Sequence, residues 1–245
     1  MKNTAIIIPT RLDAERYPGK PLAKINNVPM IIHVLNRAKE SKVGEVFVAT
    51  PDHKIFQVVE ENGGQAILTK PNHPSGSDRV YEAYTKKLKN NVDLIINLQG
   101  DMPNIKPDSI SKLEKLMRSS NCDIGTLASY LKNKNDIINP NVVKVHINEV
   151  LKGDDFFNAK DFFRIKKDCN NEKIYHHIGI YAFTSVALTK YVKLSRSKLE
   201  IERNLEQMRA MENNLILKVG LCDSLPLGVD TEKDLVEVSK EMNQL

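Results

Sequence analysis

The chain alternates short apolar runs with longer amphipathic segments through its first hundred residues. The short runs are rich in β-branched residues and predict buried strands at 5–8, 46–49, 66–68 and 94–98. The segments between them carry apolar residues three and four positions apart. They predict helices at 30–42, at 53–62 after Asp52 as a cap, and from Ser77 or Asp78 through Tyr84. This order of strands and helices predicts right-handed crossovers and a mostly parallel sheet flanked by helices, which is an α/β fold.

The pattern changes in the second half. A helix at 107–117 and a strand at 124–131 continue the alternation, but 136–163 predicts strands at 142–147 and 155–157 with no clear helix between them. Residues 161–172 are charged and predict a loop. The remaining segments predict a strand at 178–183, an amphipathic helix at 199–212, a strand at 215–221 and a helix at 231–242. We therefore expect a single domain over 1–245, with an inserted mixed-strand subdomain at about 136–175.

Composition narrows the class of protein. Among 245 residues, 41% are hydrophobic and 27% are charged, which is typical of a soluble globular protein. No run approaches the ~18 apolar residues of a membrane span, and the first residues lack the features of a signal peptide, so we expect a cytoplasmic protein without a membrane partner. Three scattered cysteines, Cys122, Cys169 and Cys222, predict neither disulfides nor a zinc site.

The net charge of +5 would permit binding to nucleic acid. However, acidic residues lie between the lysines throughout the chain, and only 6% of residues are aromatic, so few side chains are available to stack on bases. We therefore expect no nucleic-acid partner.

The loop after the first predicted strand holds three cations, Arg11, Arg16 and Lys20. Open α/β sheets bind ligands at the carboxyl ends of their strands, so the position of this loop favours an anion, most simply a polyphosphate. The alternative is a solvated basic loop, which is what most clusters of charge are.

Two acidic residues follow other predicted strands. Asp101 comes after the strand 94–98 and a Gln-Gly turn, and Asp230 precedes the last helix. Single oxygen ligands of this kind suit Mg²⁺ held jointly with substrate phosphates. For Asp230 the alternative is an ordinary helix cap.

Small residues at Ser75 and Gly76 precede a helix, where open backbone N–H groups and the helix dipole favour an anion. Arg79 lies just inside this helix and could contact a ligand or pair with Asp78 or Glu82. Because Gly and Ser occupy many turns, this motif by itself is weak.

Other polar residues have ordinary alternatives. His177 precedes a predicted strand, with Tyr181 four positions later, and adjacent histidines on a strand face opposite ways, so zinc is not expected. One of these histidines could bind a polyol. Glu206 and Gln207 lie on the helix predicted at 199–212, where a solvated face is the ordinary role.

Taken in order, these motifs resemble the 3-deoxy-manno-octulosonate cytidylyltransferases, the CMP-Kdo synthetases. The matching segments are Ile8-Pro9-x-Arg11, Arg16-x-Pro18-Gly19-Lys20-Pro21-Leu22, Ser75-Gly76-Ser77-Asp78-Arg79, Asn97-x-Gln99-Gly100-Asp101, His177-x-Gly179-Ile180-Tyr181, Leu205-Glu206-Gln207-x-Arg209 and Val229-Asp230-Thr231. The resemblance covers nearly the whole chain and implies a Rossmann-like nucleotidyltransferase fold. It also implies a cytoplasmic homodimer that makes CMP-Kdo and pyrophosphate from CTP and Kdo, with Mg²⁺, for lipopolysaccharide biosynthesis.

The resemblance also implies roles for individual residues. Arg11 and Lys20 hold the CTP phosphates with Arg16 close by, and with Asp101 they are the catalytic set. Ser75 and Gly76 approach the cytosine, with Arg79 nearby. Asp101 and Asp230 bind Mg²⁺. The residues implied for the sugar-acid site are Gln99, His177, Tyr181, Glu206 and Gln207.

Two segments depart from the family pattern. Met102 stands where many members have Glu, beside the implied metal ligand. An arginine that members commonly carry in the insertion falls on or near Asn158 here. This second change motivates an alternative substrate, 8-amino-Kdo or a nonulosonate such as sialic acid. An alternative of another class is a non-catalytic module that binds a nucleotide or nucleic acid.

Overall fold

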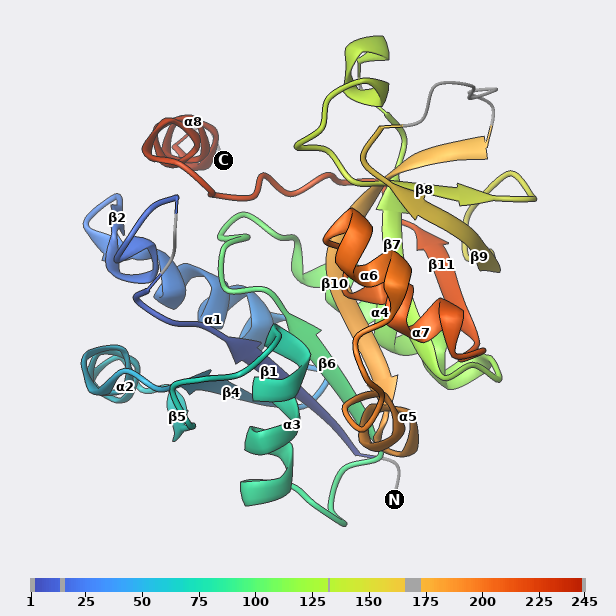
Figure 1. Ribbon diagram of the computed structural model, residues 1–245. Coiled ribbons are helices and arrows are strands. Elements are labelled where there is room, and N and C mark those ends of the chain that lie inside the picture. The colour runs from blue at the N-terminus through green and yellow to red at the C-terminus, as the bar shows by residue number, and fades with distance from the viewer. Residues whose placement is uncertain (1–2, 14–15, 132, 166–172, 244–245) are drawn as a thin grey trace. The chain divides into compact units, whose positions relative to one another are not determined.

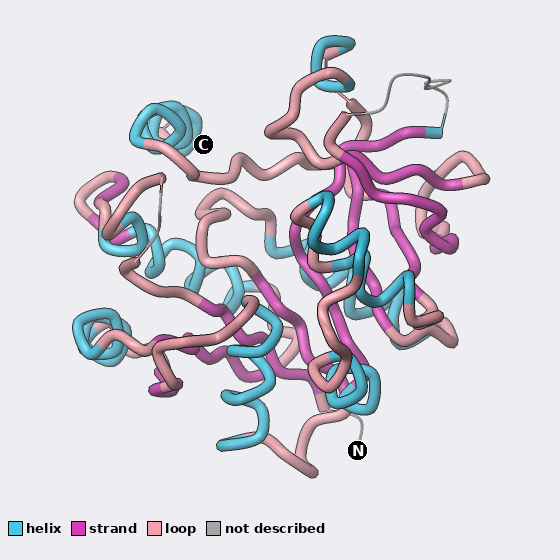
Figure 2. The backbone as a smooth tube through the Cα atoms, in the orientation of Figure 1, coloured by secondary structure: helices cyan, strands magenta, loops and turns pink. Residues whose placement is uncertain are grey.

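The computed structural model describes residues 3–13, 16–131, 133–165 and 173–243, and its elements are drawn in Figures 1 and 2. The chain forms two compact units. Unit 1 comprises Met1–Ser111 and Pro226–Leu245, and unit 2 comprises Lys112–Leu225. Whether these units form the single domain with an insertion at about 136–175 that the sequence predicts is not tested by this division, so that organisation stays a prediction.

Unit 1 contains four parallel strands in the order β5-β4-β1-β6. Their bounds are β1 Thr4–Pro9, β4 Glu45–Thr50, β5 Gln65–Leu68 and β6 Leu94–Leu98. The central strands β1 and β6 are buried along almost their whole length, and Ile6, Ile7 and Ile8 are completely buried. Such continuous burial is expected where helices cover a parallel sheet on both faces, and it confirms the strands predicted here.

The helices of unit 1 alternate with these strands. They are α1 Met30–Glu40, α2 His53–Glu61, α3 Gly76–Lys87 and the C-terminal α8 Glu232–Met242. Helix α4 (Pro107–Ser119) contains the boundary with unit 2. A short 3₁₀ helix (Lys20–Leu22) and the hairpin β2 (Lys24–Ile25) and β3 (Val28–Pro29) precede α1.

The C-terminal segment belongs to the core of unit 1. Val229 and Val238 pack with Ile25 and Met30, all four essentially without exposed surface. The last segment of unit 1 therefore follows unit 2 in the sequence.

Unit 2 is a mixed sheet in the order β10-β7-β11-β9-β8. The bounds are β7 Ile124–Ser129, β8 Lys144–Ile147, β9 Phe156–Phe163, β10 Ile174–Thr184 and β11 Leu217–Leu221. β7 and β11 are parallel and the other pairs are antiparallel. β8 also pairs with β10, so the five strands close on themselves.

The predictions for residues 155–172 were partly wrong. β9 runs to Phe163, beyond the strand predicted at 155–157 and into the loop predicted at 161–172, because β8 and β11 pair with it on either side. Residues 166–172 of that predicted loop, Cys169 among them, lie outside the described residues, whereas Cys122 and Cys222 are buried thiols.

The helix predicted at 199–212 is broken. α6 (Lys198–Arg203) ends at Asn204, whose left-handed backbone (φ 52°, ψ 51°) turns the chain, and α7 (Gln207–Glu212) starts three residues later. The apolar periodicity continues through the break, so periodicity alone does not detect it. Sequence analysis also missed α5 (Ser185–Tyr191) and the 3₁₀ helix Lys134–Ile137.

A bulge in β10 builds a buried polar contact. The register between β10 and β7 shifts between Ile178 and Tyr181, and Thr126 of β7 faces the shift. The Thr126 hydroxyl donates to the Ile180 carbonyl at 2.7 Å and lies 3.0 Å from Nε2 of His177. A hydroxyl has one hydrogen, so its oxygen accepts from Nε2–H, and Nδ1 of His177 is left as an acceptor. Burial, with the charge of His176, lowers the pKa of His177 to about 3.

None of the helices in the described part of the chain combines the length and apolar character needed to cross a membrane.

The helix break at Asn204 gives a first prediction. Ala at a left-handed position places its Cβ against the backbone, whereas Gly does not. We expect Asn204→Ala to lower the free energy of unfolding by about 1 kcal/mol and Asn204→Gly to leave it nearly unchanged. Urea unfolding of the three proteins measures this, and an alanine variant as stable as the glycine variant would contradict it.

Buried His177 gives a second prediction. The unfolded chain binds a proton at His177 below about pH 6.5, whereas the folded chain does so only near pH 3. Between these values the unfolded state holds more protons, so the stability that neutral His177 contributes is lost as pH falls. Between pH 5.5 and 4.5, wild type should lose about 1.4 kcal/mol more than His177→Gln. Urea unfolding at both pH values tests this, and equal losses would refute it.

Candidate active site

Lys20 joins three distant segments of unit 1. It is the first residue of the 3₁₀ helix, after Gly19 in a left-handed turn with φ 76°. Its ammonium Nζ donates to Asp101 Oδ2 at 2.9 Å, to the Val229 carbonyl at 2.8 Å and to Asp230 Oδ1 at 3.3 Å. The loop after β1, the turn after β6 and the segment before α8 therefore meet at one cation.

Electrostatics keep this cation charged. Burial lowers the pKa of the Lys20 ammonium, but the carboxylates of Asp101 and Asp230 outweigh burial, and the net shift is upward. Arg16 adds a second positive charge, with its guanidinium 2.9 Å from Asp230 Oδ2. That ion pair is largely exposed and contributes little to stability.

The carboxylates of Asp101 and Asp230 both accept from the Lys20 ammonium. Asp230 is not the helix cap considered as its alternative role. Thr231 caps α8 instead, and its hydroxyl accepts from the Asp234 amide. Within the described residues, no group of three or more His, Cys, Asp or Glu side chains could hold a metal. Two carboxylates that complete their coordination with phosphates and water fit Mg²⁺, which seldom uses an all-protein cage.

The turn that carries Asp101 lies tightly against the end of β1. A Cβ built on Gly100 would come within 3.3 Å of the Pro9 carbonyl oxygen and of Thr10 Cβ. The backbone carbonyl of Asp101 also accepts from the Val229 amide at 2.9 Å. Gly100 therefore permits the close approach that brings Asp101 to Lys20, while Gln99 beside it is exposed.

Asp52 anchors the loop of Arg11. Sequence analysis predicted it as a helix cap, and it does hold the N-cap position of α2, but its side chain makes no capping bond. Asp52 Oδ2 instead accepts from the Leu12 amide at 2.8 Å. The loop is also held where the Thr10 amide donates to the Ala49 carbonyl at 3.0 Å. Arg11 is exposed next to these anchors.

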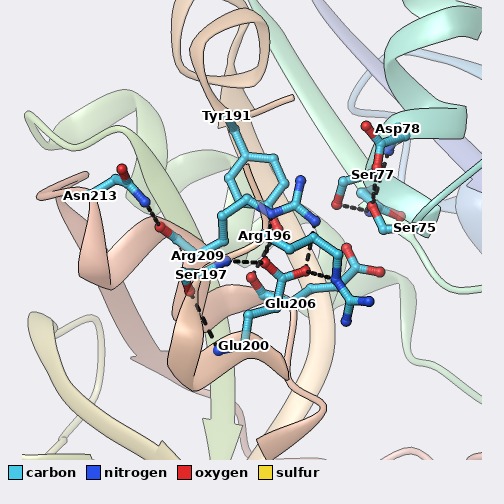
Figure 3. A network of polar contacts seen from close by, with 11 residues as sticks. Ser75, Ser77, Asp78, Tyr191, Arg196, Ser197, Glu200, Glu206, Arg209 and Asn213 are labelled. Carbon is cyan, nitrogen blue, oxygen red and sulfur yellow. Dashed lines mark hydrogen bonds and ion pairs between the residues drawn. The ribbon is translucent and has the colours of Figure 1, made fainter. Parts of the chain in front are cut away.

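Ser75 and Gly76 start α3 two or three residues earlier than predicted. Ser75, rather than Ser77 or Asp78, is the N-cap, and its hydroxyl accepts from the Asp78 amide and donates to Asp78 Oδ2 at 2.6 Å (Figure 3). The helix starts earlier because Ser75 alone has the extended backbone and the side-chain bond that a cap requires.

Arg79 holds the loop that leads to this turn. Its guanidinium is 4% exposed and donates to Thr69 Oγ1 at 2.5 Å, the Lys70 carbonyl at 3.0 Å and the Pro71 carbonyl at 3.1 Å. The guanidinium therefore bonds to loop atoms, whereas sequence analysis considered Asp78 or Glu82 as its partner within the chain. Burial, with the charge of Arg11, lowers the pKa of Arg79.

Glu82 holds the same loop from one turn further along α3. Its carboxylate accepts from the Lys70 amide at 2.9 Å and lies 2.5 Å from His73 Nε2. Burial raises the pKa of Glu82, but bonds from Lys86, the Lys70 amide and His73 outweigh it and lower the pKa to about 2. Sequence analysis gave Glu82 no such role, since a loop carbonyl or amide leaves no mark in the residue pattern.

Unit 2 brings the other predicted residues together. His177 and Tyr181 lie on β10 with ring centroids 5.4 Å apart, on either side of the bulge. Burial raises the pKa of Tyr181 well above its usual value, and the charge of Glu206 adds to this shift. Gln207 starts α7 and is buried. Four residues implied for the sugar-acid site therefore belong to unit 2, and two of them, His177 and Tyr181, are in contact.

Comparison with known proteins identifies the family. The model of a family described as cytidylyltransferase matches residues 5–219. A 3-deoxy-manno-octulosonate cytidylyltransferase of Rhodopseudomonas palustris (strain BisB18) is 43% identical over 95% of this chain and 94% of that protein. Its namesake from Thermodesulfovibrio yellowstonii is 43% identical over 98% of both chains.

Solved structures agree with this. One described as CMP:2-keto-3-deoxy-manno-octonic acid synthetase complexed with CTP superposes with a TM-score of 0.90, at 34% identity over 99% of each chain. A 4-diphosphocytidyl-2C-methyl-D-erythritol synthase from Anaerococcus prevotii shares the fold at 13% identity, with a TM-score of 0.68. The predicted α/β nucleotidyltransferase fold is confirmed, and the chain is an enzyme, a nucleotidyltransferase, as predicted. The chain belongs to the cytidylyltransferase family.

Proposed function

We propose that this cytidylyltransferase transfers the cytidylyl group of CTP to 3-deoxy-D-manno-octulosonate (Kdo) and releases pyrophosphate. Relatives that carry this activity in their names are 43% identical over nearly the whole chain. The observation that carries the proposal is the convergence of Lys20, Asp101 and Asp230 on one point of unit 1. A cation beside two carboxylates, at the carboxyl ends of parallel strands, suits a metal-bound triphosphate.

In the proposed reaction, the anomeric hydroxyl of the sugar acid attacks the α-phosphorus of CTP. A phosphorus–oxygen bond to the sugar forms, the O–H bond of the attacking hydroxyl breaks with release of its proton, and the bond from the α-phosphorus to the pyrophosphate oxygen breaks. Lys20 and Arg11 stabilise the negative charge that gathers on the departing pyrophosphate, with Arg16 beside them. Lys20 suits this role because its ammonium stays charged.

The metal proposed for this site is Mg²⁺, held by Asp101 and Asp230. Their carboxylates already share one cation, and their hard oxygen donors are those that Mg²⁺ prefers. When bound, Mg²⁺ polarises the α-phosphate and neutralises charge on the triphosphate. The two carboxylates supply the negative field that holds it.

The cytosine is proposed to lie against Ser75 and Gly76. Arg79 and Glu82 fix the loop before this turn, so the turn is presented by a rigid segment. Arg79 then acts on the nucleotide through the loop that it binds, since its donors already bond to loop atoms.

The sugar acid is proposed to contact His177, Tyr181, Glu206 and Gln207, with Gln99 as a further ligand. Neutral His177 offers an acceptor at Nδ1, because its Nε2–H bonds to Thr126. Tyr181 stays protonated and can donate from its hydroxyl, since its pKa is raised. A donor and an acceptor of this kind suit the hydroxyl groups of a sugar.

A related sugar acid is a second candidate. Asn158, on or near which an arginine of the family falls, is an exposed residue of β9 that pairs with Lys218. The loss of that guanidinium favours an acid with different substituents, such as 8-amino-Kdo or a nonulosonate. The homodimer, the cytoplasmic location and the role in lipopolysaccharide biosynthesis belong to the same proposal.

A pyrophosphate-release assay tests the function. The purified chain with CTP and Mg²⁺ is given Kdo, 8-amino-Kdo or N-acetylneuraminate in parallel. We expect one pyrophosphate per Kdo consumed and a higher kcat/KM for Kdo than for the other two acids. Faster turnover of another acid would identify that acid as the substrate. No turnover with any of the three acids would refute the function.

Asp101 gives a third prediction. Asp101→Asn keeps the size of the side chain but removes the charge that binds Mg²⁺, so kcat with CTP and Kdo should fall by about 100-fold or more. Glu61→Gln, the same change of chemistry at an exposed site of α2, is the control and should keep wild-type kcat. Circular dichroism checks that both variants are folded. If folded Asp101→Asn retains near-wild-type turnover, Asp101 does not bind the metal.

A further inference from the structure

A buried ion pair in unit 2 takes no part in the chemistry proposed above. Glu200 of α6 and Arg209 of α7 are 1% and 2% exposed. Arg209 Nε donates to Glu200 Oε2 at 2.8 Å, and Arg209 Nη2 donates to Oε1 at 2.7 Å, so the pair is bidentate (Figure 3). The two short helices on either side of Asn204 are therefore joined by their charged side chains.

Glu200 is bound on its remaining sides. Its Oε2 accepts from the Ser197 amide at 3.2 Å, completing a capping box at the start of α6, and its Oε1 accepts from Arg196 Nε at 3.1 Å. Because every one of these bonds is made to the ionised carboxylate, Glu200 holds Arg209 in one orientation.

Arg209 in turn orients Tyr191. Its guanidinium carbon lies 4.6 Å from the centroid of the Tyr191 ring, at the end of α5. Figure 3 shows the ring beside the guanidinium, and the Tyr191 side chain is completely buried. A guanidinium stacked on an aromatic face in a buried site is a strong and directional contact.

Tyr191 ends the chain of contacts at the proposed sugar-acid site. Its hydroxyl donates to the backbone carbonyl of Glu206 at 2.8 Å. Glu206 is the N-cap of α7 and Gln207 its first residue. α6 and α7 have six residues each, too few to be stable helices alone, so contacts from outside must fix their ends.

Stability alone is a weak reason for such a pair. Burying two charges is costly, and well-packed apolar side chains of similar size often stabilise a fold as well or better. Apolar side chains, however, could not hold the Arg209 guanidinium in one orientation. That orientation fixes the Tyr191 ring and so places the Tyr191 hydroxyl at the Glu206 carbonyl.

We infer that Tyr191, oriented by the Glu200–Arg209 pair, is a positioning residue that fixes the Glu206 backbone and so directs Glu206 and Gln207 toward the sugar acid. The inference rests on the proposed function, since it assumes that these two residues bind the acceptor. It assigns the ion pair to acceptor recognition and gives it no part in binding CTP.

Tyr191→Phe is the sharpest test, because it removes one hydroxyl and leaves the ring stacked on Arg209. We expect the KM for Kdo to rise about fivefold and the KM for CTP to stay within about twofold of wild type, as the loss of one hydrogen bond would give. Tyr130→Phe is the matched control: the Tyr130 hydroxyl donates to the Leu151 carbonyl at 3.3 Å in the same unit. It should leave both KM values unchanged.

Arg209→Lys gives a second measurement. It keeps the charge but loses the planar fork, so the KM for Kdo should rise, and adding Tyr191→Phe should raise it little further because both changes break one chain of contacts. If Tyr191→Phe lowers the melting temperature but leaves the KM for Kdo at the wild-type value, the residue is structural and the inference is wrong. If wild type itself does not use Kdo, the proposed function fails instead.

Discussion

The ammonium of Lys20 is the interaction on which unit 1 depends. It bonds to the carboxylate after β6, to the carbonyl of Val229 and to the carboxylate of Asp230. These contacts fix the C-terminal segment against the first strand and its loop, and the apolar cluster of Ile25, Met30, Val229 and Val238 lies beside them. The segment that completes the core therefore also delivers the second carboxylate of the proposed metal site. The contact of Lys20 with Asp101 and Asp230 therefore serves both the fold and the proposed chemistry, because a displacement of α8 would separate Asp230 from Asp101.

Local pattern predicted most of unit 1 and less of unit 2. The parallel strands are continuous apolar runs, so their burial was visible in the sequence. β9 was largely missed because residues such as Lys160 and Asp161 conceal a strand that exists through its pairing with β8 and β11. The helix break was missed because Asn204 interrupts the backbone without interrupting the apolar spacing.

For the site, too, the sequence predicted which residues lie at the strand ends but not which backbone groups their side chains bind. Residue type and strand position correctly led us to expect Asp101 and Lys20 on one edge of the sheet, and they lie 2.9 Å apart. The partners of Arg79, Asp52 and Glu82 could not be predicted, since each side chain bonds to loop backbone that only the folded chain brings near. Tyr191 and Glu200 gave no signal at all, because their importance comes from a chain of contacts across three short helices.

Under the proposed function, unit 1 carries the residues for CTP, and unit 2 carries those for the sugar acid except Gln99. Hydrogen–deuterium exchange with CTP and Mg²⁺, before any sugar acid is added, tests it most directly. We expect slower exchange at 16–22, 75–79, 100–102 and 229–231, with 177–181 and 205–209 unchanged until the sugar acid is added. Protection by CTP at 177–181 and 205–209, with none around Lys20 and Asp101, would contradict it.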